Sequence, residues 1–135
     1  MSGMPDPDNC VVLVADGDAK VLRGISTALE KAGYSVITAL GGAAALDICA
    51  RRQECIKLAI LDTAIAGSSP ELVDEMYRAH PGVRILFTSN ADESEIIQQV
   101  GRPGRVRDFL RKPFRRSQLL GRVMQVMDTP MAYTA

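Results

Sequence analysis

Short apolar segments alternate with segments of helical spacing along this chain, and that alternation constrains the fold more than any other feature. Segments with the length and β-branched content of strands lie at residues 10–15, 35–39, 57–62, 84–89 and 107–112. The first, third and fourth lack polar alternation, which is typical of parallel strands covered on both faces. Apolar residues at helical spacing follow these strands, at 21–29, 44–49, 72–76, 96–100 and 119–127. The pattern predicts an α/β fold, with a single doubly wound five-stranded parallel sheet flanked by five helices.

Length and composition indicate one globular domain. At 135 residues the chain is long enough to bury a core without disulfides or a structural metal. The hydrophobic share of 47% and the charged share of 24% favour neither a disordered chain nor a membrane protein. We expect the domain to occupy residues 10–128, between a disordered N-terminal tail at 1–9 and a C-terminal tail at 129–135.

Charge and hydropathy restrict the partners and the location. The 16 basic and 16 acidic residues cancel, which argues against direct binding of nucleic acid over the whole surface. No apolar run approaches the length of a membrane span, and the first ten residues lack the pattern of a secretory signal. We therefore expect a cytoplasmic domain without membrane contact.

The cysteines and the single histidine give little support to catalytic or metal chemistry. Cys10, Cys49 and Cys55 match neither a CxxC motif nor a zinc spacing, so we expect core or surface thiols rather than a disulfide framework or metal site. His80 lies in the turn-like sequence "AHPG", which argues against Ser-His or Cys-His catalysis.

Charged and hydroxyl side chains gather where the expected strands end. In an open α/β sheet the carboxyl ends of the strands form the functional edge. The residues expected there are Asp16, Asp18, Asp62, Thr88, Ser89 and Lys112. Carboxylates so close together repel one another unless a cation neutralises them. Mg²⁺ suits the set, because it binds through one or two carboxylates and leaves positions for water and phosphate oxygens.

Four motifs in order carry a resemblance to a known family. They are the acidic residues of "LVADGDA", the aspartate of "LAILDTAIAG", the hydroxyl of "LFTSN" and the lysine before proline in "FLRKPF". From about Cys10 to Asp128 the chain resembles the receiver domain of two-component response regulators. The resemblance implies a flavodoxin-like fold of receiver type. It also implies a phosphoprotein that assists its own phosphorylation and dephosphorylation rather than an enzyme with an outside substrate.

The resemblance implies a role for each matching residue. Asp62 corresponds to the phosphoacceptor, which takes a phosphoryl group from a phosphohistidine on a histidine kinase or histidine phosphotransfer protein. Asp16 corresponds to an acidic residue of the magnesium pocket, and Ala64 to the position whose backbone carbonyl completes the metal shell. Thr88 matches the hydroxyl that hydrogen-bonds the phosphoryl group, and Lys112 the ammonium that compensates its charge.

A conformational switch is also implied. Phe109 lies where the family often has an aromatic residue that turns inward when the hydroxyl at Thr88 is drawn to the phosphoryl group. The alternative is a phenylalanine that fills the core. The family pattern also implies a cis peptide bond between Lys112 and Pro113.

Gly17 is a departure from the family pattern, which has two adjacent acidic residues after the first strand. Here the second acidic position is glycine, and the next carboxylate, Asp18, is displaced by one residue. Neighbouring residues of an extended chain point to opposite sides, although the freedom of glycine would let the loop rotate and bring Asp18 in. Two hypotheses stay open: a weakened but working magnesium site, or a pseudo-receiver that serves as a protein-interaction module with weak or no metal binding and phosphorylation.

A cluster of arginines precedes and follows the fifth expected strand. Its members are Arg102, Arg105, Arg107, Arg111, Arg115 and Arg116. The cluster is either a partner or homodimer surface around the fourth helix, fifth strand and fifth helix, or a solvated basic face.

Overall fold

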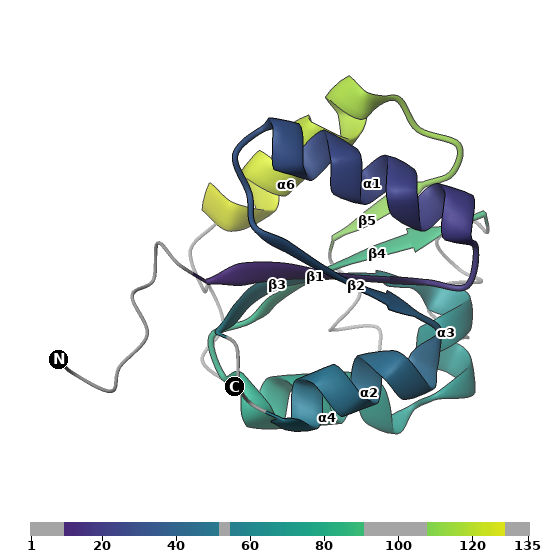
Figure 1. The fold of residues 1–135 in the computed structure, drawn as a ribbon, viewed down its shortest axis with the longest axis vertical. Coiled ribbons are helices and arrows are strands. Elements are labelled where there is room, and N and C mark those ends of the chain that lie inside the picture. Colours follow the sequence, from purple (N-terminus) through teal and green to yellow (C-terminus); the bar gives the residue numbers. More distant parts are fainter. Residues whose placement is uncertain (1–9, 52–54, 91–107, 129–135) are drawn as a thin grey trace, which may run out of the picture.

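A computed structural model describes residues 10–51, 55–90 and 108–128 of the chain. Its centre is a parallel sheet of five strands in the order β2-β1-β3-β4-β5. The strands are β1 (Val11–Asp16), β2 (Val36–Leu40), β3 (Ile56–Asp62), β4 (Arg84–Ser89) and β5 (Phe109–Arg111). The doubly wound parallel sheet predicted from the sequence is confirmed (Figure 1).

Helices cover both faces of the sheet. α1 (Ala19–Lys31) and α6 (Arg116–Asp128) lie against one face, while α2 (Gly42–Arg51), α3 (Thr63–Ser68) and α4 (Glu71–Ala79) lie against the other (Figure 1). The described residues thus hold five helices around the sheet. None of these helices is long and apolar enough to cross a membrane.

Two hydrophobic clusters form the core, one on each face of the sheet. Along β1 the residues alternate between them: Leu13 and Ala15 pack toward α2 and α4, whereas Val12 and Val14 pack toward α1 and α6. A strand buried on both sides needs apolar residues at every position, which explains the unbroken apolar run at 10–15.

Two glycines, Gly33 and Gly42, lie where a larger side chain would be strained or would clash. Gly33 follows α1 with a φ of 99°, a conformation that glycine adopts without steric cost, as its place after the first predicted helix suggests. Gly42 opens α2 against the end of α3, and a Cβ added there would lie 3.2 Å from the Cβ of Ser69, the C-cap of α3, and closer still to its Oγ. The glycine therefore lets the start of α2 approach its neighbours closely.

The helices differ from the sequence prediction in one place, and one predicted helix is not tested by the structure. Helix α3, which begins directly after Asp62, was not predicted, because six residues are too few to show helical periodicity. The predicted helix at 96–100 lies outside the described residues, as do both predicted tails and Arg102, Arg105 and Arg107.

The expectation that the cysteines would not form a disulfide is wrong for one pair. Cys10 and Cys55 are bonded to each other, with their Cα atoms 4.6 Å apart. Cys10 directly precedes β1 and Cys55 directly precedes β3, and the backbone N–H of Val11 donates to the carbonyl of Cys55. The pairing of β1 with β3 brings the two sulfurs together across 45 residues, which local spacing rules do not detect. Cys49 is buried in α2, as expected of a core thiol.

Candidate functional site

The period-two geometry of the strands brings three predicted site residues to one place. Asp16, Asp62 and Thr88 each lie two residues beyond an apolar side chain that packs toward α1 and α6. Side chains two apart in a strand share a face, so all three belong to the α1 and α6 side of the sheet, at its carboxyl edge. Asp62 and Thr88 are register partners on β3 and β4. The expected convergence of these residues is therefore present.

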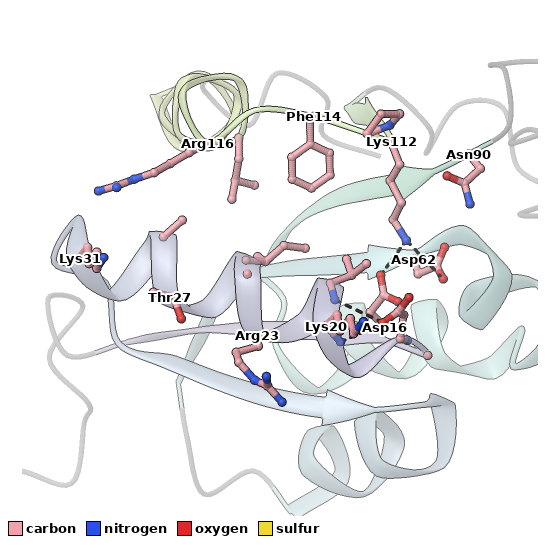
Figure 2. Close-up of a pocket in the computed structure, with 18 residues that line it drawn as sticks. Asp16, Lys20, Arg23, Thr27, Lys31, Asp62, Asn90, Lys112, Phe114 and Arg116 are labelled. Carbon is pink, nitrogen blue, oxygen red and sulfur yellow. Dashed lines mark hydrogen bonds and ion pairs between the residues drawn. The ribbon is translucent and has the colours of Figure 1, made fainter.

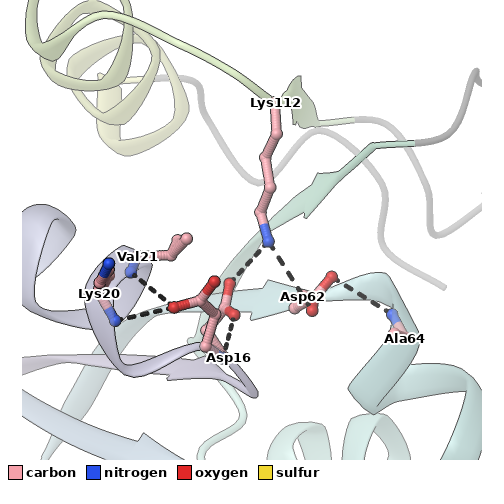
Figure 3. Close-up of polar contacts among 7 residues, drawn as sticks. Asp16, Lys20, Val21, Asp62, Ala64 and Lys112 are labelled. Atoms are coloured by element: carbon pink, nitrogen blue, oxygen red, sulfur yellow. Dashed lines mark hydrogen bonds and ion pairs between the residues drawn. The ribbon is translucent and has the colours of Figure 1, made fainter.

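Lys112 joins the two carboxylates. Its ammonium nitrogen donates to Asp16 Oδ2 at 2.8 Å and lies 3.8 Å from Asp62 Oδ2 (Figure 3). Lys112 directly follows β5, and the peptide bond to Pro113 is cis, as the family resemblance implied. Asp16 is 2% exposed, so its charge is held in the interior by the ammonium group.

Asp62 lies at the start of a helix and is partly buried. It is the N-cap of α3, and its Oδ1 accepts a long hydrogen bond of 3.4 Å from the backbone N–H of Ala64. Burial raises the pKa of the Asp62 carboxyl above its ordinary value, and the nearby Asp16 charge acts in the same direction. The Lys112 ammonium and the Ala64 N–H oppose that rise in pKa.

Ala64 lies in the first turn of α3 (Figure 3). Backbone carbonyls in an α-helix point toward the C-terminal end, so the carbonyl of Ala64 is directed along α3 and away from Asp62. To contact a metal beside Asp62, that carbonyl would have to leave its helical orientation.

Asp18 faces the start of α1 rather than the other carboxylates. Its Oδ1 accepts hydrogen bonds from the backbone N–H groups of Lys20 at 2.8 Å and Val21 at 3.4 Å. Its own backbone N–H donates to Asp16 Oδ1 at 2.8 Å. The side chain of Asp18 is thus the N-cap of α1.

Thr88 places an unsatisfied hydroxyl beside Asp62. The residue is 1% exposed, and its Oγ1 makes no hydrogen bond to any residue that the structure describes. Buried hydroxyls nearly always have a hydrogen-bond partner, so the Thr88 hydroxyl is available to donate to a group bound beside Asp62. Phe109, the other predicted switch residue, is the register partner of Phe87 and packs against the core cluster on the α2 and α4 side.

The site opens into a groove of about 980 Å³ between α1 and the segment from Lys112 into α6. Asp16, Asp62 and Lys112 lie at one end of it, and Phe114 contributes to its wall (Figure 2). The lining also includes several basic side chains along its length: Lys20, Arg23, Lys31 and Arg116. Basic side chains therefore contribute to the lining of the groove that leads to the carboxylates.

Comparison with known proteins decides the family. Residues 12–124 match the response regulator receiver domain. The chain belongs to the response regulator receiver domain family. The receiver domain also resembles a crystal structure of a response regulator from Thermotoga maritima, with a TM-score of 0.74 and 26% identity, over 90% of this chain and 99% of that one.

Two curated proteins are similar to this receiver domain. It is 30% identical over 113 residues to the nisin biosynthesis regulatory protein NisR of Lactococcus lactis subsp. lactis, which covers 83% of this chain and 48% of that protein. It is 29% identical over 119 residues to the sensor kinase CckA of Brucella abortus (strain 2308), which covers 87% of this chain and 12% of that protein. The chain thus spans less than half the length of either relative.

Receiver domains usually bind Mg²⁺, and the donor set of this one fits a sparse magnesium site. Asp16 and Asp62 supply two carboxylates around one point, and Mg²⁺ is commonly held by one or two carboxylates with water and phosphate oxygens. Across the described ranges, no group of three or more Asp, Glu, His or Cys side chains is arranged to hold a metal ion. Asp16 and Asp62 would hold the ion in this receiver domain.

Sequence reasoning missed two features of the receiver domain's site. One is the capping role of Asp18, for which a signal existed, since an aspartate directly before a helical apolar pattern is a common N-cap. The other is the basic groove, to which α1 and α6 contribute from opposite ends of the sequence. That contact depends on packing and has no local signal.

Proposed function

We propose that this receiver domain accepts a phosphoryl group on Asp62 from a phosphohistidine of a histidine kinase or histidine phosphotransfer protein, in the cytoplasm. The observation that carries the proposal is the orphaned Thr88 hydroxyl, buried beside Asp62 in the sheet register. A phosphoryl oxygen on Asp62 would give that hydroxyl an acceptor. Lys112, already within ion-pair distance of Asp62, supplies the compensating positive charge.

The transfer exchanges one bond to phosphorus for another. A carboxylate oxygen of Asp62 forms a bond to phosphorus, the bond from phosphorus to the histidine nitrogen breaks, and the imidazole leaves with its electron pair. A Mg²⁺ ion held by Asp16 and Asp62 would neutralise part of the phosphoryl charge. Asp62 must be ionised to react, and Lys112 favours that form against the effect of burial. Loss of the phosphoryl group to water returns the carboxylate.

Thr88 links the chemistry to a surface. A hydrogen bond from the Thr88 hydroxyl to the phosphoryl group would pull on β4, next to Phe109 on β5. We propose that Phe109 follows this shift and changes the face formed by the predicted fourth helix, β5 and α6. Recognition of a partner, or of a second copy of this chain, would use that face.

The basic groove favours the approach of a donor along α1. Lys20, Arg23 and Lys31 come to its lining from α1 and Arg116 from α6 (Figure 2). A donor with acidic residues around its phosphohistidine would match this charge. The groove ends at Asp62, so a donor seated there would present its phosphorus to the acceptor.

A second candidate function rests on the same residues. Asp16 and Asp62 both contact Lys112, Asp18 caps α1 and Gly17 has no carboxylate, so a cation already stands between the two acids. This arrangement favours a pseudo-receiver that uses the fold as a protein-interaction module without phosphorylation.

Transfer from a phosphohistidine donor separates the two functions. A histidine phosphotransfer protein carrying radiolabelled phosphate is mixed with the wild-type domain or with Asp62→Asn in the presence of magnesium. We expect the label to move to the wild-type domain and to stay on the donor with the variant. Label that stays on every donor tested, with the domain folded, favours the pseudo-receiver.

A further inference from the structure

Asp18 carries out a task that is incompatible with metal binding in the same conformation. Its backbone is extended, with φ of −108° and ψ of 117°, and its carboxylate accepts from two N–H groups of the first turn of α1. The first N–H groups of a helix have no partner within the helix, so this cap stabilises α1. Turning the carboxylate toward Asp62 would break both hydrogen bonds.

Asp18 also fixes Asp16 through its backbone. The N–H of Asp18 donates to Asp16 Oδ1. Asp16 Oδ2 accepts from Lys112 (Figure 3). Both oxygens of the buried carboxylate are therefore held in place. The capped conformation of residue 18 and the orientation of Asp16 support each other.

Gly17 is not required by the backbone. Its φ lies outside the left-handed region, and a Cβ added there would meet no atom within 4 Å. The residue is exposed and lines the groove beside Asp16. An aspartate at this position would meet no steric clash and would add a carboxylate to the lining of the groove that holds Asp16 and Asp62.

These observations define the metal chemistry of the site, given the function proposed above. We propose that Asp18 is a positioning residue rather than a metal ligand, and that Asp16 and Asp62 alone supply the carboxylates for a divalent cation. Gly17 contributes none, so the site holds Mg²⁺ weakly. A site with two carboxylates and a lysine between them has less negative charge for the cation than one with three carboxylates. The absence of a carboxylate at position 17 therefore sets the Mg²⁺ affinity of the site.

The test measures Mg²⁺ binding and thermal stability, not phosphorylation. Isothermal titration with magnesium chloride compares the wild-type domain with Asp18→Asn, Asp18→Ala and Gly17→Asp. Asparagine caps a helix about as well as aspartate, so Asp18→Asn keeps the cap and removes only the charge. Glu30→Gln, at the far end of α1, is the control for removal of one exposed charge. Gly24→Asp, at an exposed position farther along α1 in the same groove, is the control for a charge added to the groove at another position.

We expect Asp18→Asn to match Glu30→Gln in Mg²⁺ affinity and the wild type in melting temperature. Asp18→Ala should lower the melting temperature, and the asparagine variant should not. Gly17→Asp should bind Mg²⁺ about tenfold more tightly than Gly24→Asp, because it adds a ligand charge at the site. If the wild type shows no binding heat, Gly17→Asp alone should acquire it.

Two results would overturn the inference. One is a loss of about tenfold or more in Mg²⁺ affinity for Asp18→Asn relative to Glu30→Gln, which would make Asp18 a ligand. The other is an equal affinity of Gly17→Asp and Gly24→Asp. Phosphorylation of Asp62 is measured separately, so a domain that ranks its magnesium affinities as expected and still takes no phosphoryl group contradicts the proposed function alone.

Discussion

The ammonium group of Lys112 lies 2.8 Å from the carboxylate of Asp16, although 96 residues separate them in the sequence. The pair ties the end of β1 to the segment that follows β5, across the middle of the sheet. Asp16 is almost fully buried, so its charge depends on this partner. The pair is therefore a structural element as well as part of the site.

Replacing Lys112 by methionine should destabilise the domain. The change keeps most of the side-chain volume and leaves the buried Asp16 charge unpaired, which typically costs about 3 kcal/mol. Urea denaturation in a magnesium-free buffer measures the loss. The same substitution in an Asp16→Asn background should cost much less, since no buried charge is then left behind. Equal losses in the two backgrounds would show that the ion pair does not govern stability.

Asp62→Asn should make the domain more stable at neutral pH. The pKa of Asp62 in the folded state lies above its ordinary value of 3.8, so the folded protein holds this proton more tightly than the unfolded chain. The stability gained from binding this proton is fully present below pH 3.8 and is lost as the pH rises through the raised pKa of Asp62. Asparagine stays neutral and retains an oxygen for the α3 cap. Urea denaturation across pH should show the advantage of the variant at neutral pH and its shrinkage as the pH falls toward 3.8. A variant less stable than wild type at neutral pH contradicts this account.

Thr88→Val should not lower the free energy of unfolding of the unphosphorylated domain. The hydroxyl is buried without a partner among the described residues, and removing such a group regains about 1 kcal/mol of desolvation cost. Valine keeps the β-branched shape that a strand favours. Chemical denaturation tests the sign of the change. A loss of about 1 kcal/mol or more would mean that the hydroxyl has a partner before phosphorylation.

Reduction of the Cys10–Cys55 disulfide should lower stability. The bond closes a loop of 45 residues, and in the chain-entropy account such a crosslink contributes up to about 4 kcal/mol. Melting curves with and without a reductant measure the effect. Cys55→Ser is the control, because its melting temperature should not respond to the reductant. Alkylation of the denatured, unreduced protein should modify Cys49 alone, and modification of all three cysteines would contradict the bond.

Residues whose positions follow from strand periodicity could be predicted from the sequence. The expected end of each strand lies within one residue of the observed end, and the shared face of Asp16, Asp62 and Thr88 follows from counting in steps of two. Lys112 was expected at the same edge because it comes at the end of the fifth expected strand. The parallel order of the strands follows from the alternation with helices. This part of the site needs no information beyond the pattern.

The pattern signals that Asp18 can cap α1 but does not fix the direction of its side chain, because that direction depends on the backbone angles at a single residue after the strand. The disulfide depends on how β1 and β3 align, which brings Cys10 beside Cys55. Helix α3 is too short for its periodicity to be visible, so the sequence pattern does not reveal the helix that Asp62 caps. Each of these differences arises from local geometry or from strand register.

The most direct test of the central claim is intact-mass analysis of the purified domain after incubation with a small phosphodonor such as phosphoramidate, with and without magnesium. Phosphoramidate carries a phosphorus–nitrogen bond like that of phosphohistidine and needs no cognate kinase. The account predicts a gain of one phosphoryl group by the wild-type domain, dependent on magnesium and absent from Asp62→Asn. A folded wild-type domain that gains no phosphoryl group, or an Asp62→Asn variant that is labelled equally, would contradict it.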